Sequence, residues 1–315
     1  MKRSSPKSLL LFYGSNRFNC TIFALVIIKI SWLFAGARAY LYYVQALWCR
    51  KRGLDMLGKL EALILGIIQG LTEFLPISST GHLYLGRNLF GLQEAGLLLD
   101  TMLHVGTLLA VFVFYKNEFV KIIRNPFSKL TFLLIVGTIP AVVIGLLFKD
   151  YFEEISKTGV TIGWEFLVTG LFLWIADSAK NGYKKMDDIS YTDAFIIGSF
   201  QAAAILPAIS RSGFTIVAAL WRKLDRETAA YFSFLLSTPA IVGAVILQSL
   251  DLFSGTGEEI SLSALVIGIL SSALFGYFAV KWMIGFLKKR SLKPFAVYVW
   301  ILGFAVLFFQ FTGQF

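Results

Sequence analysis

The stretch QGLTEFLPISSTGHL, residues 69–83, places a glutamate, two serines and a histidine inside a segment that is otherwise apolar. A second stretch, LPAISRSGFT at residues 206–215, repeats the combination of a proline followed by serines and adds an arginine. Ionisable side chains at bilayer depth are costly and are functional-site candidates by default. The surroundings of these two stretches therefore decide both the fold and the function that the sequence predicts.

The composition is that of a membrane protein. Of the 315 residues, 57% are hydrophobic and 15% are charged, whereas soluble domains average about 45–50% apolar and about 25% charged residues. Hydrocarbon satisfies no backbone polar group, so spanning segments must be helices, and an open sheet is excluded. We therefore predict an all-α, polytopic membrane protein. Six segments approach the roughly 20 apolar residues that span a bilayer: 97–115, 130–148, and about 164–179, 228–249, 261–284 and 294–313.

The positive charges indicate topology. The formal net charge is +10, but Lys and Arg gather in short segments between apolar spans, which argues against a nucleic-acid partner. The two cysteines, Cys20 and Cys49, have no metal-site or disulfide spacing. Basic loops belong on the cytoplasmic side, so the acidic loops 149–159 and 251–259 are predicted outside. The loops assigned inside are 116–129, 180–193, 222–227 and 285–293.

This assignment predicts two re-entrant helical hairpins. Residues 194–222 begin and end on the inner side, so they must enter the membrane and turn back. If residues 60–92 are also a pair that turns back, they enter from the outer side, because the span that follows, 97–115, ends inside. The two polar stretches then form the tips of hairpins that approach each other from opposite faces, beside about six membrane-spanning helices.

Internal similarity relates the two hairpins. A constant shift along the chain aligns four pairs of identical residues: Gly66 with Gly198, Gln69 with Gln201, Ser78 with Ser210, and Gly81 with Gly213. Together with the opposite orientations, this predicts an inverted repeat with halves at about 56–179 and 180–315. Such repeats commonly place their site near the midplane among broken helices.

The N-terminal segment, residues 1–55, fits this plan poorly. Its apolar part, 19–37, is interrupted by Lys29, and the basic run at 50–52 would lie outside, against the positive-inside tendency. Two interpretations stay open. The segment is either a peripheral extension or upstream translation artefact, which we favour, or an additional anchoring helix. The membrane domain is assigned to residues 56–315.

The first polar stretch predicts a broken helix with an anion site at its turn. Gln69 and Glu73 are four residues apart and share one helix face. Pro76 must end or distort this helix. Candidate N-caps of the next helix are Ser78, Ser79 and Thr80. The turn would present free backbone N–H groups and a positive dipole end, which suit a phosphate.

A nucleophile is also available in this stretch. His82 follows Ser79 by three residues and Ser78 by four, so a hydroxyl–imidazole contact is geometrically available on a helix. A serine beside a histidine is the arrangement expected of an activated nucleophile.

The second polar stretch supplies a positively charged side chain. Pro207 breaks its helix, and Ser210 and Ser212 can cap the next one. Arg211 offers a planar fork suited to phosphate oxygens, and Thr215 adds a hydroxyl one helical turn further on. Glu73 is a candidate ion-pair partner for Arg211 or a candidate ligand for a divalent cation.

Structural roles compete with these functional ones. Ser and Thr commonly hydrogen-bond between membrane helices, and a Glu–Arg pair can be purely structural. We regard Asp100 and His104 as weaker candidates, one turn apart on 97–115, and Gln201 as ambiguous. The convergence of a carboxylate, hydroxyls, an imidazole and a guanidinium at one depth favours a functional site.

Both motifs resemble those of the undecaprenyl-diphosphatase family, bacterial membrane enzymes linked to bacitracin resistance. The resemblance rests on QGLTEFLPISSTGH and PAISRSGFT and runs from about Met56 to the C-terminus, including FSFLLSTPAIVGA (232–244) and KPFAVYVW (293–300). It implies removal of one phosphate from undecaprenyl diphosphate, which regenerates the lipid carrier for peptidoglycan and other wall polymers. It also implies an inverted-repeat fold, a divalent cation (Mg²⁺ or Ca²⁺) and work from the outer side of the bacterial cytoplasmic membrane.

The resemblance assigns roles to residues of this chain. The implied partners are a polyprenyl diphosphate and membrane lipids, and a homodimer stays open. Gln69 and Glu73 match the family's metal-associated pair, although glutamine at 69 removes one carboxylate, and Ala208 replaces a usual glycine. We expect Ser79 as nucleophile and His82 as acid or base, with Glu73 and Arg211 also catalytic, unless an activated water attacks and Ser79 only binds phosphate. The expected phosphate-binding residues are Ser78, Thr80, Ser210, Arg211, Ser212 and Thr215.

A transporter or flippase of a lipid phosphate or small anion is the alternative from another class, because inverted repeats with broken helices are common among transporters. The Ser–His spacing favours the enzyme, since a transporter needs no nucleophile. A structural membrane protein whose polar residues only pack helices is the third hypothesis.

Overall fold

The computed structural model describes residues 58–90, 92, 97–178, 182–253 and 260–312. The predictions for residues 1–55 lie outside this part of the chain. The described residues are helical, and their only β-type pairing is an isolated bridge between Lys184 and Leu224. The elements are α3 (Lys59–Phe74), α4 (Ser79–Phe90), α5 (Leu97–Phe114), α6 (Lys116–Arg124), α7 (Lys129–Leu147), α8 (Lys149–Thr158), α9 (Ile162–Asp177), the 3₁₀ turn η2 (Met186–Asp188), α10 (Tyr191–Ala203), α11 (Arg211–Trp221), α12 (Arg226–Phe253), α13 (Leu262–Leu287) and α14 (Lys293–Phe311).

Serine residues are the N-caps of several of these helices. Ser128 accepts a hydrogen bond from the backbone N–H of Thr131 at the start of α7, and Ser261 caps α13 in the same way. Ser190 and Asp193 form a capping box at the start of α10. These caps satisfy N–H groups that have no partner inside a helix, so the boundaries follow from local sequence.

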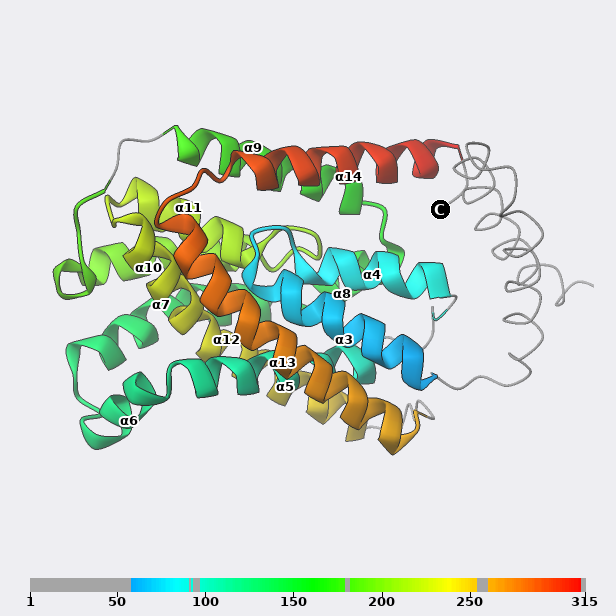
Figure 1. The fold of residues 1–315 in the computed structure, drawn as a ribbon, viewed down its shortest axis with the longest axis horizontal. Helices are drawn as coiled ribbons and strands as arrows, with labels where there is room; N and C mark the ends of the chain where they lie inside the picture. The colour runs from blue at the N-terminus through cyan, green and yellow to red at the C-terminus, as the bar shows by residue number, and fades with distance from the viewer. Residues whose placement is uncertain (1–57, 91, 93–96, 179–181, 254–259, 313–315) are drawn as a thin grey trace, which may run out of the picture. The chain divides into compact units, whose positions relative to one another are not determined.

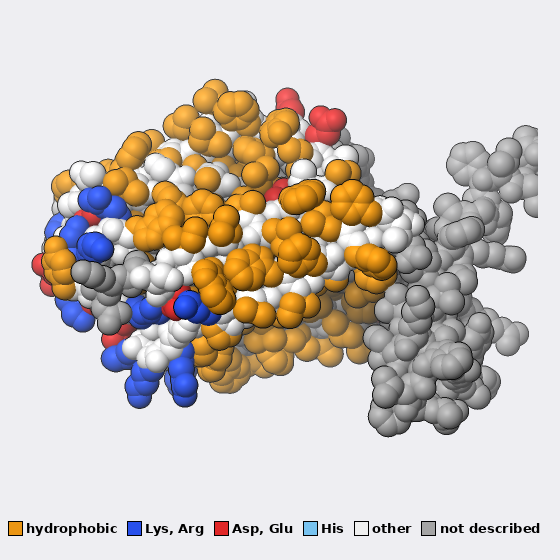
Figure 2. Space-filling model, turned by 90° about the horizontal axis from the view of Figure 1, so that it is seen from above, with side chains coloured by type: hydrophobic (Ala, Val, Ile, Leu, Met, Phe, Trp, Pro, Cys, Tyr) orange, Lys and Arg blue, Asp and Glu red, His pale blue; other side chains and the backbone are white. Residues whose placement is uncertain are grey.

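The apolar helices are those of a multi-pass membrane protein. Each of the six predicted segments coincides with a helix, and four of them are long and apolar enough to cross a membrane: α7, α12 over Arg226–Gln248, α13 and α14. A fifth span arises if α5 and α6, which are bent by 77° against each other, are counted together. Figure 2 shows apolar side chains over the middle of one face, with Lys and Arg gathered at one end.

Two predicted loops contain helices instead. Residues 116–129 include α6, and residues 149–159 include α8. In α6 the apolar residues Phe119 and Ile122 are spaced like one face of a helix and pack against the main core. The charge of these segments identified them as loops, but their periodicity is that of short amphipathic helices.

Two helix–turn–helix units dominate the centre. α3 and α4 form one, and α10 and α11 form the other; they extend toward opposite ends, and their turns lie together (Figure 1). α3 packs on α13 and α10 packs on α7. A methyl group at Gly66 would collide with Gly268 of α13, and one at Gly198 would collide with Gly137 of α7. These glycines therefore allow the close backbone approach that holds each unit in place.

Ion pairs tie the basic end together. Lys184 and Arg222 both bind the buried carboxylate of Asp193, at 2.9 and 2.7 Å. Burial alone would raise the pKa of Asp225. The Lys185 ammonium at 2.7 Å and the hydrogen bonds that Thr228 donates from the next helix lower it by more. The pKa of Asp225 therefore lies below its usual value.

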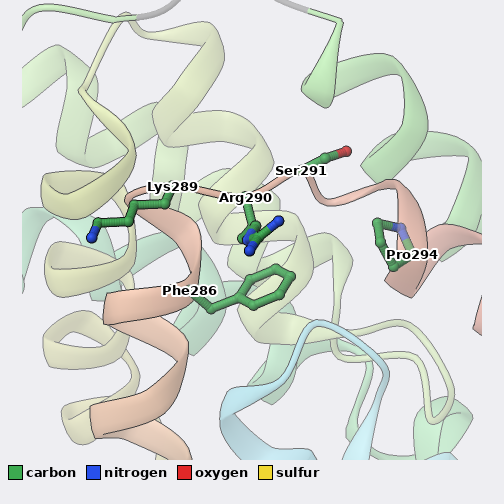
Figure 3. Close-up of a pocket in the computed structure, with 5 residues that line it drawn as sticks. All are labelled: Phe286, Lys289, Arg290, Ser291 and Pro294. Carbon is green, nitrogen blue, oxygen red and sulfur yellow. The ribbon is translucent and has the colours of Figure 1, made fainter.

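A cavity of about 710 Å³ opens at the turn between α13 and α14 (Figure 3). It is lined by Phe286, Lys289, Arg290, Ser291 and Pro294. None of these residues belongs to the predicted site.

Candidate functional site

The first turn breaks where the sequence predicts. α3 ends at Phe74, Leu75 is extended, and α4 begins at Ser79. The Ser78 hydroxyl accepts a hydrogen bond from the N–H of Gly81 at 3.3 Å. Ser78 itself has φ +69°, a left-handed conformation that is uncommon for serine. Such strain persists where the surrounding structure requires it, and it is frequent at functional sites.

The second turn has the same cap. α11 begins at Arg211, and the hydroxyl of Ser210 accepts from the N–H of Gly213 at 3.1 Å. Ser78 with Gly81 and Ser210 with Gly213 are two of the pairs that the sequence comparison aligned. Among the predicted candidates, Ser78 and Ser210 are therefore the residues that cap, and each turn presents a helix N-terminus.

Direct hydrogen bonds join the two turns. The Ser78 hydroxyl donates to the carbonyl of Pro207 at 3.2 Å. The Ser212 hydroxyl donates to the carbonyl of Leu75 at 2.9 Å. Side chains that are far apart in sequence thereby meet in one place, as the sequence predicts.

Glu73 is the centre of the site. Its side chain is 1% exposed, and its Oε1 accepts a hydrogen bond from Arg211 Nη2, which completes an ion pair. Its Oε2 accepts from Ser79 Oγ at 2.5 Å and from Gln69 Nε2 at 3.0 Å. A buried carboxylate needs such partners to stay ionised, and four of the predicted residues supply them to one another.

His104 also faces this carboxylate. Its Nε2 lies 3.7 Å from Glu73 Oε2, and its Nδ1 lies 2.7 Å from the backbone oxygen of Asp100. The carboxylate of Asp100 in turn pairs with Arg87 at 2.7 Å. A pair that the sequence ranks as weaker therefore lies beside the central glutamate.

His82 has different partners. Its Nδ1 lies 2.6 Å from the backbone oxygen of Ser78, and its Nε2 lies 2.8 Å from the Tyr298 hydroxyl. The His82 and Tyr298 rings are stacked, with centroids 5.7 Å apart. Ser79 donates to Glu73, so the available Ser79–His82 contact is not the one that these side chains make.

The remaining predicted residues lie in the helices that flank the turns. Thr215 donates back to the carbonyl of Arg211 at 3.0 Å, inside the first turns of α11. Thr80 is half-buried in the first turn of α4. Gln201 is buried, and its amide atoms have no hydrogen-bond partner among the described residues.

The side-chain oxygens of Gln69 and Glu73 are candidate ligands for a divalent metal ion that also contacts the substrate. Gln69 Oε1 is buried and lacks a hydrogen-bond partner within the described part of the chain, and it belongs to the side chain that already contacts Glu73. No group of three or more His, Cys, Asp or Glu that could hold a metal occurs among the described residues. Mg²⁺ usually binds through one or two carboxylates plus substrate phosphates and water, and Gln69 with Glu73 suits that mode.

Two helices supply neighbours that sequence reasoning missed. α14 contributes Tyr298, which lies in the family-like stretch 293–300 without any separate signal. α9 contributes Glu165, whose carboxylate accepts from the backbone N–H of Ala208, and Thr169, whose hydroxyl accepts from the N–H of Ser210. An acid inside the apolar segment 164–179 was the signal that could have identified Glu165.

Comparisons with known proteins identify the family of this chain. The family model described as bacitracin resistance protein BacA matches residues 62–305. The chain is 77% identical over 256 residues to undecaprenyl-diphosphatase 4 of Bacillus cereus (strain ZK / E33L), with 81% of this chain and 99% of the relative covered. It is 48% identical over 260 residues to the undecaprenyl-diphosphatase of Carboxydothermus hydrogenoformans, with 81% and 98% covered. The chain belongs to the BacA family of bacitracin resistance proteins.

Proposed function

We propose that this membrane protein is a phosphatase that hydrolyses undecaprenyl diphosphate to undecaprenyl phosphate and inorganic phosphate. The observation that carries the proposal is the convergence of Ser79 and Arg211 on Glu73 between two helix N-termini. The names of the relatives supply the substrate. The reaction recycles the lipid carrier for cell-wall synthesis, which fits bacitracin resistance.

The diphosphate binds between the two turns. The first N–H groups of α4 and α11 and the positive ends of both helices suit phosphate oxygens. Arg211 has further N–H donors besides the one on Glu73, and a guanidinium is planar and matches phosphate geometry. The hydroxyls expected to bind or orient the phosphate belong to Ser78, Thr80, Ser210, Ser212 and Thr215.

Ser79 is the proposed nucleophile. Its Oγ attacks the terminal phosphorus, the anhydride P–O bond breaks, and undecaprenyl phosphate leaves. The hydroxyl proton passes to Glu73, which already accepts it in a hydrogen bond at 2.5 Å. Water then hydrolyses the phosphoserine. Arg211 stabilises the charge of the transferring group, where preorganised electrostatics contributes most.

His82 serves as acid or base through the edge of the site. Its Nε2 is within hydrogen-bond reach of the Tyr298 hydroxyl, so by way of that hydroxyl His82 would take a proton from the attacking water or give one to the leaving phosphate. Direct attack by water is the variant mechanism, in which Ser79 only binds phosphate.

A divalent cation completes the site. Glu73 and the unpartnered Oε1 of Gln69 would hold it together with the substrate phosphates. When bound, it supplies charge neutralisation at the diphosphate.

The proposed arrangement in the membrane is an inverted repeat with two re-entrant hairpins and about six spans. The helix pairing supports it: α3 packs on α13 as α10 packs on α7, and α13 also packs on α5 as α7 packs on α12. We place the protein in the bacterial cytoplasmic membrane. The α3–α4 hairpin enters from the end opposite the basic loops, which supports access from the outer side.

Phosphate release from a polyprenyl diphosphate tests the proposal. Purified protein in detergent is assayed with and without EDTA, beside Ser79→Ala and the control Ser199→Ala. Ser199 lies on α10, and its hydroxyl donates to the Phe195 carbonyl of its own helix at 2.9 Å. Release that requires metal and disappears with Ser79→Ala alone is expected. No release from folded protein, with cation and chain length varied, would refute the phosphatase.

A transporter or flippase is the second candidate, because two broken helices meet from opposite ends (Figure 1). Reconstitution into liposomes discriminates the two. Movement of a lipid phosphate across the bilayer that survives Ser79→Ala would favour transport.

A further inference from the structure

One side of the site is formed by a helix that neither polar motif contains. α9 carries Glu165 and Thr169, which are four residues apart and therefore share a helix face. Both side chains are buried, at 5% and 0% exposure. Phe166, between them, lies edge-on to the His82 ring. α9 therefore contacts the start of α4.

The second turn depends on these two side chains for its backbone hydrogen bonds. Ala208 donates its N–H to Glu165 Oε2. Ser210 donates its N–H to Thr169 Oγ1 at 3.2 Å, and the same hydroxyl donates to the carbonyl of Ala208 at 3.5 Å. Buried N–H groups outside a helix need such partners, so Glu165 and Thr169 hold this turn.

The turn that Glu165 and Thr169 hold leads directly into α11. Ser210 is the N-cap of α11 and Arg211 its first residue. On the opposite side the turn is held by Ser78, which donates to the carbonyl of Pro207. The position of the guanidinium relative to Glu73 thus depends on a turn fixed from α9 on one side and from the first hairpin on the other.

We propose that Glu165 and Thr169 are positioning residues for Arg211. Their hydrogen bonds go to the backbone of Ala208 and Ser210, and they act by fixing the backbone of residues 208–210. The inference rests on the proposed phosphatase activity, because it explains how Arg211 is held in position in that active site.

Conservative variants separate hydrogen bonding from packing. Glu165→Gln keeps an oxygen that can accept from Ala208, whereas Glu165→Ala removes it. Thr169→Ser keeps the hydroxyl, whereas Thr169→Val removes it with little change in shape. We expect Glu165→Ala and Thr169→Val to lower kcat about tenfold or more, with a smaller effect on KM, because misplacing a catalytic group is costly. We expect Glu165→Gln and Thr169→Ser to stay within about threefold of the wild type.

A double-mutant cycle tests whether the effect passes through Arg211. Thr169→Val is combined with Arg211→Lys, and kcat is measured by phosphate release. If Thr169 acts through Arg211, the double variant should be about as slow as Arg211→Lys alone, because coupled residues are not additive. Independent, multiplying losses would overturn the proposal.

The outcomes distinguish this inference from the proposed function. Wild-type protein that releases no phosphate would refute the phosphatase. An active wild type with folded Glu165→Ala and Thr169→Val variants at full activity would refute only the positioning role. If Glu165→Ala does not fold in detergent, the near-isosteric Thr169→Val decides, and equal losses in Thr169→Val and Thr169→Ser would also overturn the proposal.

Discussion

Removing the guanidinium of Arg211 should disable the site in two separable ways. In the structure Arg211 pairs with Glu73, and the exposed fractions of their side chains are 23% and 1%. Arg211→Ala would take away the cation that faces the transferring phosphate. It would also leave a buried carboxylate without its main counter-charge, and this second effect is on stability.

The two magnitudes differ. Losing a preorganised charge-stabilising contact typically costs about 3 kcal/mol in the transition state, which corresponds to about a hundredfold in kcat. Breaking a buried ion pair by removing one partner costs about 3–5 kcal/mol of stability. Because Arg211 is partly exposed and Glu73 keeps the hydrogen bonds from Ser79 and Gln69, we expect the lower end of that range.

The assay measures turnover and unfolding on the same preparations. Phosphate release gives kcat, and thermal unfolding in detergent gives the loss of stability. Adding Glu73→Gln to Arg211→Ala removes the unpaired charge, so it should restore part of the stability and none of the activity. Arg222→Ala is the matched control, because Arg222 pairs with the buried Asp193 away from the site. It should lower stability and leave kcat per folded molecule unchanged.

One result would refute this reasoning. If Arg211→Ala is folded and turns over within about threefold of the wild type, Arg211 does not stabilise the transferring group. A loss of activity in Arg222→Ala as large as that in Arg211→Ala would show that the assay reports unfolding.

Three further changes test other parts of the structure. Tyr298→Phe keeps the ring stacked on His82 but removes a hydroxyl at 2.8 Å; losing about 1 kcal/mol should slow phosphate release about fivefold, and an unchanged rate would exclude a role for this hydrogen bond. Gly81→Ala would place a methyl group 2.6 Å from the ring of Phe166; overpacking of this kind costs about 1–3 kcal/mol, so a lower melting temperature is expected and an unchanged one would contradict the tight contact. Asp225→Asn tests pH dependence. The lowered pKa of Asp225 means that its stabilisation is present above about pH 4 and is lost as the pH falls through the folded value. The melting temperatures of variant and wild type should therefore differ at pH 7 and converge in acid, and a constant difference would contradict the ion pair.

The turns of the site could be predicted from the sequence because their causes are local. A proline that ends one helix and a serine that caps the next act within a few residues, and both Ser78 and Ser210 cap as expected. The contact between the two turns could be predicted for another reason. The positive-inside tendency predicts that both segments turn back inside the membrane, and tips at a similar depth are then expected to approach each other.

The part played by α9 could not be predicted in this way. Glu165 lies in a segment that reads as an apolar span, and its partner is a backbone N–H at Ala208. Backbone groups carry no sequence signal, so nothing in the residue types at 207–210 indicates which side chain satisfies them. Only the packing of α9 against α11 brings the two together.

The two histidines also show that contacts between helices could not be predicted from the sequence. In each, Nδ1 lies against the carbonyl oxygen four residues back, Ser78 for His82 and Asp100 for His104. A carbonyl only accepts, so Nδ1 must carry the hydrogen in both rings, and Nε2 is the atom left to act. Helical spacing relates His82 to Ser79 and therefore selected His82 as the neighbour of the nucleophile. Across helices, however, the Nε2 of His82 meets Tyr298 and the Nε2 of His104 faces Glu73. Spacing along one helix identifies which side chains can meet on that helix, whereas the packing of α5 on α3 decides which imidazole lies beside the central carboxylate.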